Sequence, residues 1–556
     1  MAKYKTYGAD HNEDNKPNIV STGSMAKSGL KMALATIVSR LTGFLRTWSM
    51  AFALGSGTVA SAYSIANGMP SFICDLIMGG VLGAAFLPVY LQAKSTGGKS
   101  LTGGYASATM NWTIIILGIA TLLCVVFSPQ VILTQTFTVG DGNEVYEQSV
   151  WFFRIFSLQI LFYGVSGILS GLLNAERVYG LPALAPIINN IITCASFIVY
   201  AFLSSSQANV ALLVLAFGTT AGVVAQAAMQ LPIAIANGFR WRPTLRFPEG
   251  LAKETVRMSA ATMIYIVGSL LAMSARNAFA LSAGTEGPSI LTYAWTWFQL
   301  PYGIVAVSVA TTVFTEMGDA ASKHDASAFS ASYGTGMRWT LLAMIPLSAL
   351  LAVVAPSVAS LFQFGAFDAT DAGYVGNILR MWCLSLPFYA VVMFYYKTYA
   401  ALHRMMLFAV PMVMLNLLQC FLYAVLVNRI GLVGITLADL IYYAISTVVL
   451  TILLPRAARF ETAGTAETSP IAVHGIGIFL AKTIGATAVL IIVSIAVVFV
   501  VSFIPLGGAV GGLISILSGG VSGLAAYVIG MKIFGMPETK AISNTAKKFI
   551  SKISRT

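Results

Sequence analysis

The sequence predicts an all-α polytopic membrane protein with about 14 transmembrane helices. Hydrophobic residues make up 57% of the 556 residues and charged residues only 9%, whereas an average soluble domain carries about 25% charged residues. A soluble protein of this size cannot cover its surface with so little charge, so the composition excludes a secreted domain, a soluble enzyme and a single-span receptor. At about 22 residues per span, the apolar residues suffice for roughly 14 helices.

Fourteen apolar runs are long enough to cross a bilayer, and the turns between them contain Gly, Pro, Ser or charged residues. The predicted spans lie near residues 30–54, 62–92, 110–132, 150–173, 182–204, 209–236, 257–283, 289–315, 337–362, 374–401, 406–428, 432–454, 473–504 and 508–533.

Basic residues are concentrated in alternate loops, which predicts the orientation of the chain. With the N-terminus in the cytoplasm, the loops on that side contain Lys94, Lys99, Arg177, Arg240, Arg242, Arg246, Lys253, Lys323, Arg404, Arg456 and Arg459. The opposite loops contain one basic residue, Arg429, and the acids Asp141, Glu144, Glu147, Glu286, Asp368 and Asp371. This positive-inside pattern predicts an even number of spans with both termini cytoplasmic. It also explains the net charge of +12, so we expect no nucleic acid partner.

A weak internal repeat predicts the domain organisation. The segment Phe52–Gly57 recurs as Phe279–Gly284, and Pro70 of the second span has a counterpart in Pro301 of the eighth. The similar offsets predict two six-helix lobes in a parallel pseudo-repeat, which is a transporter architecture. The predicted units are a polar cytoplasmic tail at 1–25, lobes at 26–240 and 250–456, two C-terminal helices at 472–534, and a basic cytoplasmic tail at 535–556.

Charged residues inside the apolar runs are the candidate functional residues, because an arginine at mid-bilayer costs about 2.5–3.5 kcal/mol even on the lenient insertion scale. Arg40, Asp75, Arg276 and Asp439 lie deepest in their spans. Arg276 is expected to face a cavity or to pair with Asp75, and Asp439 with Asn416 is a candidate site for a cation. The sequence contains no nucleotide-binding or metalloprotease motif, and its scattered His and Cys residues predict no metal site. We therefore expect a transporter without catalytic residues.

Several motifs resemble the MurJ (MviN) family of lipid II flippases. They are Ser39–Arg46, Phe52–Gly57, Ala85–Tyr90 and Leu361–Gly365, and the resemblance covers roughly residues 26–460 and the 14-span count. It implies a flippase of the bacterial cytoplasmic membrane that moves a polyprenyl-pyrophosphate-linked peptidoglycan precursor, lipid II, from the inner to the outer leaflet by alternating access. Helices 13 and 14 would hold the lipid tail.

The resemblance also implies a central cationic cavity in which Arg40 and Arg46 bind the pyrophosphate. The chain departs from the family pattern at other positions of that cavity. It has Ser61 where the family has an aspartate, Asp75 where it has an arginine, and Thr296 near another family arginine. Ser61, Asp75 and Thr296 are therefore candidate substrate-binding positions with altered charge, and Arg276 is expected to supply a cation from a neighbouring helix.

Three alternative functions remain open: a flippase for another undecaprenyl-linked glycan, a cation-coupled small-molecule exporter, and a non-transporting cell-wall scaffold. No cofactor is expected, and the sequence leaves open coupling to the membrane potential or to a monovalent cation. The expected partners are the lipid-linked precursor, membrane lipids and cell-wall synthesis enzymes.

Overall fold

The computed structural model describes residues 22–80, 86–140, 142–247, 251–458, 476–505 and 507–539. Within these ranges the elements are helices, as the sequence predicts, because a helix closes its backbone hydrogen bonds internally and needs no water in the bilayer core. The polar tail up to residue 21 and the basic tail from residue 540 onwards lie outside the described residues.

The described helices account for the predicted number of spans. Eleven helices are long and apolar enough to cross a membrane, and the bent pair α14 (Ala369–Cys383) and α15 (Leu386–Ala401), with an angle of 56°, makes a twelfth. Two more helices, α1 (Thr22–Leu54) and α2 (Thr58–Gly80), lie at the first two predicted spans, although they are not among the helices that meet this criterion. The described segments therefore correspond to the fourteen apolar runs.

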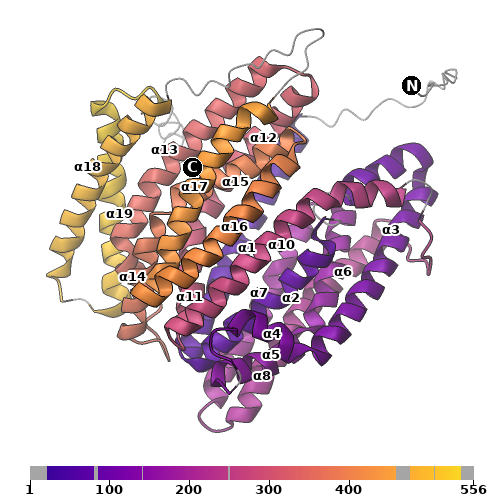
Figure 1. Ribbon diagram of the computed structural model, residues 1–556, viewed down its shortest axis with the longest axis horizontal. Coiled ribbons are helices and arrows are strands. Elements are labelled where there is room, and N and C mark those ends of the chain that lie inside the picture. Colours follow the sequence, from indigo (N-terminus) through magenta and orange to yellow (C-terminus); the bar gives the residue numbers. More distant parts are fainter. Residues whose placement is uncertain are drawn as a thin grey trace.

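The first group of helices precedes residue 247 and packs mainly within itself. Helix α1 packs on α7, α7 on α8, α2 on α5, and α3 on α6, and these helices lie side by side at the indigo and magenta end of Figure 1. The remaining bounds are α3 (Phe86–Val126), α4 (Ser128–Thr136), α5 (Glu144–Phe156), α6 (Leu158–Ala175), α7 (Gly180–Leu203), α8 (Ala208–Ala228) and α9 (Gln230–Ala236). We refer to residues 22–247 as the first half.

The second group comprises residues 251–458, the second half. Its remaining bounds are α10 (Leu251–Ala283), α11 (Gly287–Pro301), η2 (Tyr302–Ala306), α12 (Val307–Ser322), α13 (Ala326–Ser360), α16 (Met405–Ile430) and α17 (Val433–Ala457). Helix α10 packs on α16 but also on α2 and α4, and Figure 1 shows it running between the two groups. It therefore joins the halves along their length.

The last two helices form a pair on the flank of the second half. Helices α18 (Ile476–Ser502) and α19 (Gly508–Ile533) pack on each other and on α13, at the yellow edge of Figure 1. Ser494 of α18 donates a hydrogen bond to the carbonyl of Gly519 in α19. Tyr527 of α19 donates one to the carbonyl of Leu342 in α13. Small residues thus allow the close approach of α18 and α19.

One predicted span contains a break that matters for the site. Pro301 lacks a backbone N–H and clashes with the preceding turn, and it is followed by the five-residue π-helical turn η2. The run then continues as α12 to Ser322. Turns of this kind often occur at functional sites.

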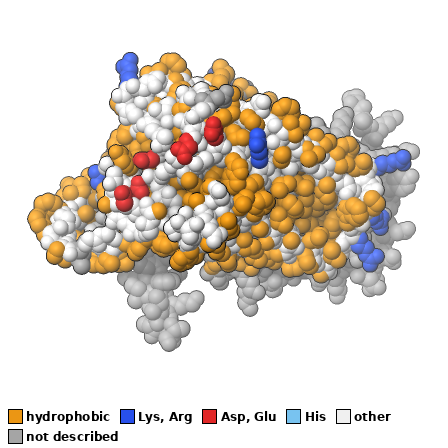
Figure 2. All heavy atoms as spheres, turned by 90° about the horizontal axis from the view of Figure 1, so that it is seen from below, with side chains coloured by type: hydrophobic (Ala, Val, Ile, Leu, Met, Phe, Trp, Pro, Cys, Tyr) orange, Lys and Arg blue, Asp and Glu red, His pale blue; other side chains and the backbone are white. Residues whose placement is uncertain are grey.

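Acidic side chains gather on one face of the molecule. Figure 2, which views the molecule from below, shows them with few basic side chains beside them. Several acids begin helices: Glu144 and Glu147 lie in the first turn of α5, and Asp368 and Asp371 form a capping box at the start of α14. Carboxylates at these positions stabilise the N-terminal dipoles of the helices.

Candidate functional site

The two arginines of α1 point to different parts of the molecule. Arg40 has an exposed side chain that acts electrostatically on Tyr302 and Tyr389 of the second half. Arg46 is partly buried and acts on Tyr63 and Tyr163 inside the first half. Six residues on a helix correspond to about 240° of rotation, so the two side chains emerge roughly 120° apart. They do not form a single two-arginine clamp in this conformation.

Arg40 lies in a notch formed by a glycine of the π-helical turn. A Cβ atom on Gly303 would collide with the Arg40 guanidinium, so a side chain there would displace the end of the Arg40 side chain from this position. No hydrogen bond or ion pair joins Arg40 to another described residue. The guanidinium therefore lies where the two halves meet, with its donors available to a ligand.

Ser61 and Thr296 contribute to contacts between the halves. Ser61 is fully buried, and its hydroxyl lies 3.3 Å from the hydroxyl of Ser289 in α11. Thr296 donates to the carbonyl of Thr292 and lies 3.4 Å from the hydroxyl of Thr47 in α1. Both positions thus join the halves through short neutral side chains.

A set of hydrogen bonds that we call the interhalf latch fastens the end of α1 to the second half. The Trp48 indole donates to the carbonyl of Leu361 at 3.1 Å, and the amide of Ala366 donates to the carbonyl of Phe52 at 2.9 Å. The latch also comprises Ser56 with Asp371, Ser289 with the carbonyl of Ser56, and Tyr293 with the carbonyl of Gly55.

Two glycines explain why two separate sequence motifs meet in the latch. Gly55 and Gly365 both have φ angles near +60°, which favour glycine. A Cβ on Gly365 would also collide with the Phe52 carbonyl, and one on Gly55 would collide with that of Ala366. The motifs Phe52–Gly57 and Leu361–Gly365 therefore pack directly against each other.

Arg276 is enclosed by the second half and does not pair with Asp75. Its guanidinium carbon lies 5.5 Å from the ring centre of Trp295 and 5.9 Å from that of Trp382, distances typical of cation–π contacts. Among the described residues no ion pair joins Arg276 to Asp75, and the Asp75 side chain is exposed. Arg276 instead lines a cavity of the second half, and its predicted role toward the substrate stays a prediction.

Asp439 is a carboxylic acid of α17 that lines the same cavity as Arg276. It is buried and accepts hydrogen bonds from Trp382 and Gln419, both at 2.8 Å, and from the Tyr423 hydroxyl. These donors occupy three of the roughly four acceptor positions of a carboxylate. Arg276 acts on Asp439 electrostatically but lies beyond ion-pair distance. In this conformation Asp439 offers little to a second cation.

The cavity that these groups line has a volume of about 280 Å³. Arg276, Asn416 and Asp439 line it together with aromatic residues, of which Trp295 and Tyr389 are two. Asn416 is 2% exposed, and its amide nitrogen has no hydrogen-bond partner. The structure thus brings both residues of the candidate cation site to one cavity, together with Arg276.

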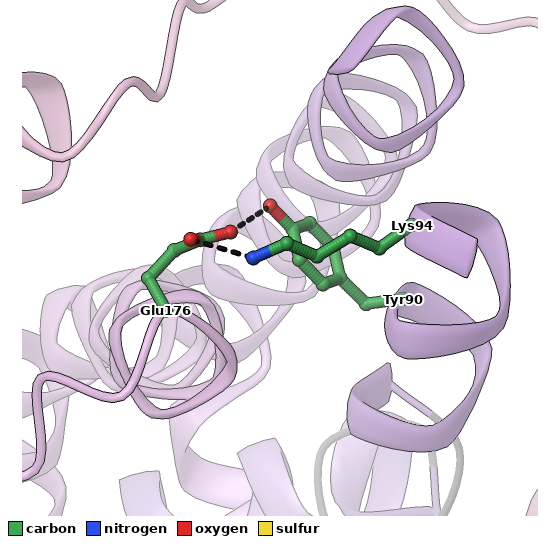
Figure 3. Close-up of polar contacts among 3 residues, drawn as sticks. All are labelled: Tyr90, Lys94 and Glu176. Carbon is green, nitrogen blue, oxygen red and sulfur yellow. Dashed lines mark hydrogen bonds and ion pairs between the residues drawn. The ribbon is translucent and has the colours of Figure 1, made fainter. Parts of the chain in front are cut away.

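At another place in the first half, Figure 3 shows an ion pair that joins α3 to the end of α6. Lys94 lies 2.7 Å from Glu176, which also accepts a hydrogen bond from Tyr90 at 3.0 Å. All three residues belong to the first half. The contact therefore stabilises that half without joining it to the other.

Sequence reasoning missed the aromatic and amide partners of the charged residues. Trp382, Gln419 and Tyr423 escaped notice because their spacing fits ordinary apolar helices. The available signal was the buried carboxylate of Asp439, since a buried charge needs donors. Gly303 carried no signal of its own, because its role depends on Arg40 of a distant helix.

The comparisons with known proteins agree with this architecture. The family model described as lipid II flippase MurJ matches residues 50–519. A probable lipid II flippase MurJ of Borreliella burgdorferi is 24% identical over 430 residues, covering 76% of this chain and 82% of its own. The lipid II flippase MurJ of Burkholderia cenocepacia is 25% identical over 358 residues, covering 63% and 68%.

Solved structures show the same fold. A lipid II flippase MurJ in an inward closed conformation has a TM-score of 0.71 and 22% identity, covering 91% of this chain and 98% of its own. An inward-facing multidrug resistance transporter of the MATE family, from the MOP superfamily, has a TM-score of 0.62 and 14% identity, covering 77% and 100%. Because the family model matches most of the chain, this protein belongs to the lipid II flippase MurJ family.

Proposed function

We propose that this protein is a flippase that moves lipid II, a polyprenyl-pyrophosphate-linked peptidoglycan precursor, from the inner to the outer leaflet of the bacterial cytoplasmic membrane. The family match over residues 50–519 supports the substrate class. The feature of the site that best supports it is Arg40, whose guanidinium lies between the halves without a partner among the described residues. A guanidinium binds phosphate oxygens through two parallel hydrogen bonds.

Transport proceeds by alternating access between the lobes at 26–240 and 250–456. The interhalf latch closes the outer end, and its hydrogen bonds must break before the head group leaves. Arg40 holds the pyrophosphate, and Arg46 contributes positive charge from within the first half. Helices α18 and α19 hold the lipid tail. The membrane potential or a monovalent cation gradient drives the cycle, and cell-wall synthesis enzymes receive the product.

Complementation tests this function directly. Cells depleted of their native lipid II flippase and carrying this gene should regain lipid II in the outer leaflet, measured by an impermeant enzyme or label that reaches only that leaflet. Vector-only cells and cells carrying the Arg40→Ala variant are the controls. Full protein levels in the membrane without any outer-leaflet lipid II would contradict the proposal.

The orientation can be tested with single cysteines in a cysteine-free background. Both termini are proposed to be cytoplasmic, which places Gly373, exposed near the start of α14, outside the cell. Ser322, exposed at the end of α12, then lies inside. An impermeant thiol reagent should label a cysteine at position 373 in intact cells and one at 322 only after lysis. The reverse result would show the opposite orientation, with both termini outside the cell.

Another undecaprenyl-linked glycan is the second candidate substrate. Ser61 and Thr296 are neutral and take part in contacts between the halves. Asp75 is acidic. The charges that these positions offer to a head group therefore differ from the pattern that the resemblance implies. Substrates that differ only in the glycan distinguish the candidates. Reconstituted protein that moves the glycan-linked lipid but not lipid II would favour the second.

A further inference from the structure

We propose that the cavity beside Arg276 is a binding site for a carboxylate group attached to a small apolar body. The site lies within the second half, between α10, α11, α15, α16 and α17. It is separate from the notch in which Arg40 lies.

The first argument is that Arg276 has donors without acceptors. Its Nε is buried and has no hydrogen-bond partner, and no hydrogen bond or ion pair joins the rest of its guanidinium to a described residue. The rings of Trp295 and Trp382 fix its position but accept no directed hydrogen bond in its plane. A buried N–H without an acceptor is costly, and a ligand in the cavity can supply the acceptor.

The second argument is that Asp439 does not serve as that acceptor. Its oxygens already accept from Trp382, Gln419 and Tyr423. When it is ionised, Asp439 lies close enough to act on Arg276 and would repel a doubly charged phosphate more than a singly charged carboxylate. A planar carboxylate also matches the two-pronged guanidinium.

The third argument comes from the walls of the cavity. Its volume of about 280 Å³ is close to the lower end, about 300 Å³, of typical ligand pockets. Met273, Met393 and Met412 line it, and flexible thioethers adapt to apolar ligands of varied shape. The unpartnered amide of Asn416, which is 2% exposed, provides a second buried donor.

One wall of the cavity also borders the notch in which Arg40 lies. Tyr389 lines the cavity, and Arg40 acts on it electrostatically. Tyr302, which precedes Gly303, stacks edge-on against Tyr389 with ring centres 4.8 Å apart. If the proposed function holds, the carboxylate belongs to the head group whose pyrophosphate Arg40 binds. If it fails, the same cavity takes a free carboxylate.

Ligand binding to the purified full-length protein in nanodiscs tests the site without any transport assay. Benzoate is the probe, and its neutral isostere benzamide is the matched control. Benzoate, measured by calorimetry and by the rise in the thermal unfolding midpoint, should bind the wild type more tightly than benzamide does. Arg276→Gln should weaken benzoate binding at least about tenfold, as expected for losing a charge-assisted contact, and leave benzamide unchanged.

Two further variants separate binding from folding. Arg276→Lys keeps the positive charge but loses the two-pronged geometry, so its affinity for benzoate should lie between those of the wild type and Arg276→Gln. Arg429→Gln, which changes an exposed arginine of α16, should bind as the wild type does. Equal affinity for benzoate and benzamide in the wild type, or unchanged benzoate binding in a folded Arg276→Gln protein, would overturn the proposal.

A cation control and a substrate comparison complete the test. Stabilisation by Na⁺ or K⁺ with any anion, lost in Asp439→Asn, would show a cation site and overturn the proposal. Lipid-linked substrates with and without a free carboxylate on the head group then identify the source. Faster transport of the carboxylate form in the wild type but not in Arg276→Gln assigns it to the head group, whereas equal transport with retained benzoate binding assigns the cavity to a free carboxylate.

Discussion

The two ends of the molecule are held together in different ways. At the proposed outer end, the interhalf latch joins α1 to α11 and to the segment before α14 through backbone and side-chain hydrogen bonds. At the opposite end, the described ion pairs, Lys94 with Glu176 and Lys323 with Asp319, each lie within one half. The difference teaches that the latch joins the halves by hydrogen bonds at the proposed outer end, in addition to the packing of α10, whereas the described ion pairs at the other end each stabilise one half.

The largest expected effect on transport comes from removing the positive charge of Arg40, which lies between the two ends of the molecule. Arg40→Ala should lower lipid II transport at least about tenfold, because a charge-assisted, two-pronged contact with phosphate oxygens is lost. Arg40→Lys should restore little, since a point charge does not replace the planar group. Outer-leaflet accessibility at matched expression measures both. Full transport by Arg40→Ala would reduce Arg40 to a structural residue.

A several-fold loss of transport is expected when a side chain at Gly303 fills the notch in which Arg40 lies. Gly303→Ala places a methyl group where the guanidinium lies, so Arg40 must move and transport should fall. Gly318→Ala is the matched control, because nothing lies within 4 Å of its added Cβ. Transport assays and thermal unfolding separate the effects. Equal transport by the two variants would show that Arg40 does not act from this notch.

A smaller change, in stability, is expected inside the second half. Tyr423→Phe removes one of three hydrogen bonds to the buried Asp439 and should cost about 1 kcal/mol of unfolding free energy, since hydrogen bonds between helices in membranes average about 0.6 kcal/mol and reach about 1.7 kcal/mol. Tyr374→Phe, at an exposed position, is the control. Unfolding in a mild detergent measures both, and equal midpoints would mean that Gln419 and Trp382 suffice.

The smallest effect concerns a local contact at the end opposite the latch. The backbone N–H of Ala328 and the Ser327 hydroxyl lower the pKa of Asp325, which caps α13. A lowered pKa in the folded state stabilises the fold above the unfolded pKa of about 3.9, and this contribution is lost as the pH falls through the folded pKa. The thermal midpoint should therefore decline slightly less with acidification in Asp325→Asn than in the wild type. An identical decline would mean that the cap does not titrate with folding.

The sequence predicted the spans well because apolar length is a local property. It also singled out Arg40, Arg276 and Asp439 as candidates, since each interrupts an apolar run. It could not assign their neighbours. The Arg276–Asp75 alternative rested on unlike charge, whereas the fold places aromatic rings around Arg276 and leaves Asp75 exposed. Contacts between distant helices, such as Arg40 with Gly303, depend on packing that one sequence does not reveal.

A disulfide across the interhalf contact tests alternating access most directly. The Ser61 and Ser289 hydroxyls lie 3.3 Å apart, so cysteines at both positions in a cysteine-free background should cross-link α2 to α11. Oxidised protein should hold the outer end closed and lose lipid II transport, and a reducing agent should restore it, while either single cysteine should transport in both conditions. Undiminished transport by fully cross-linked protein would contradict the account.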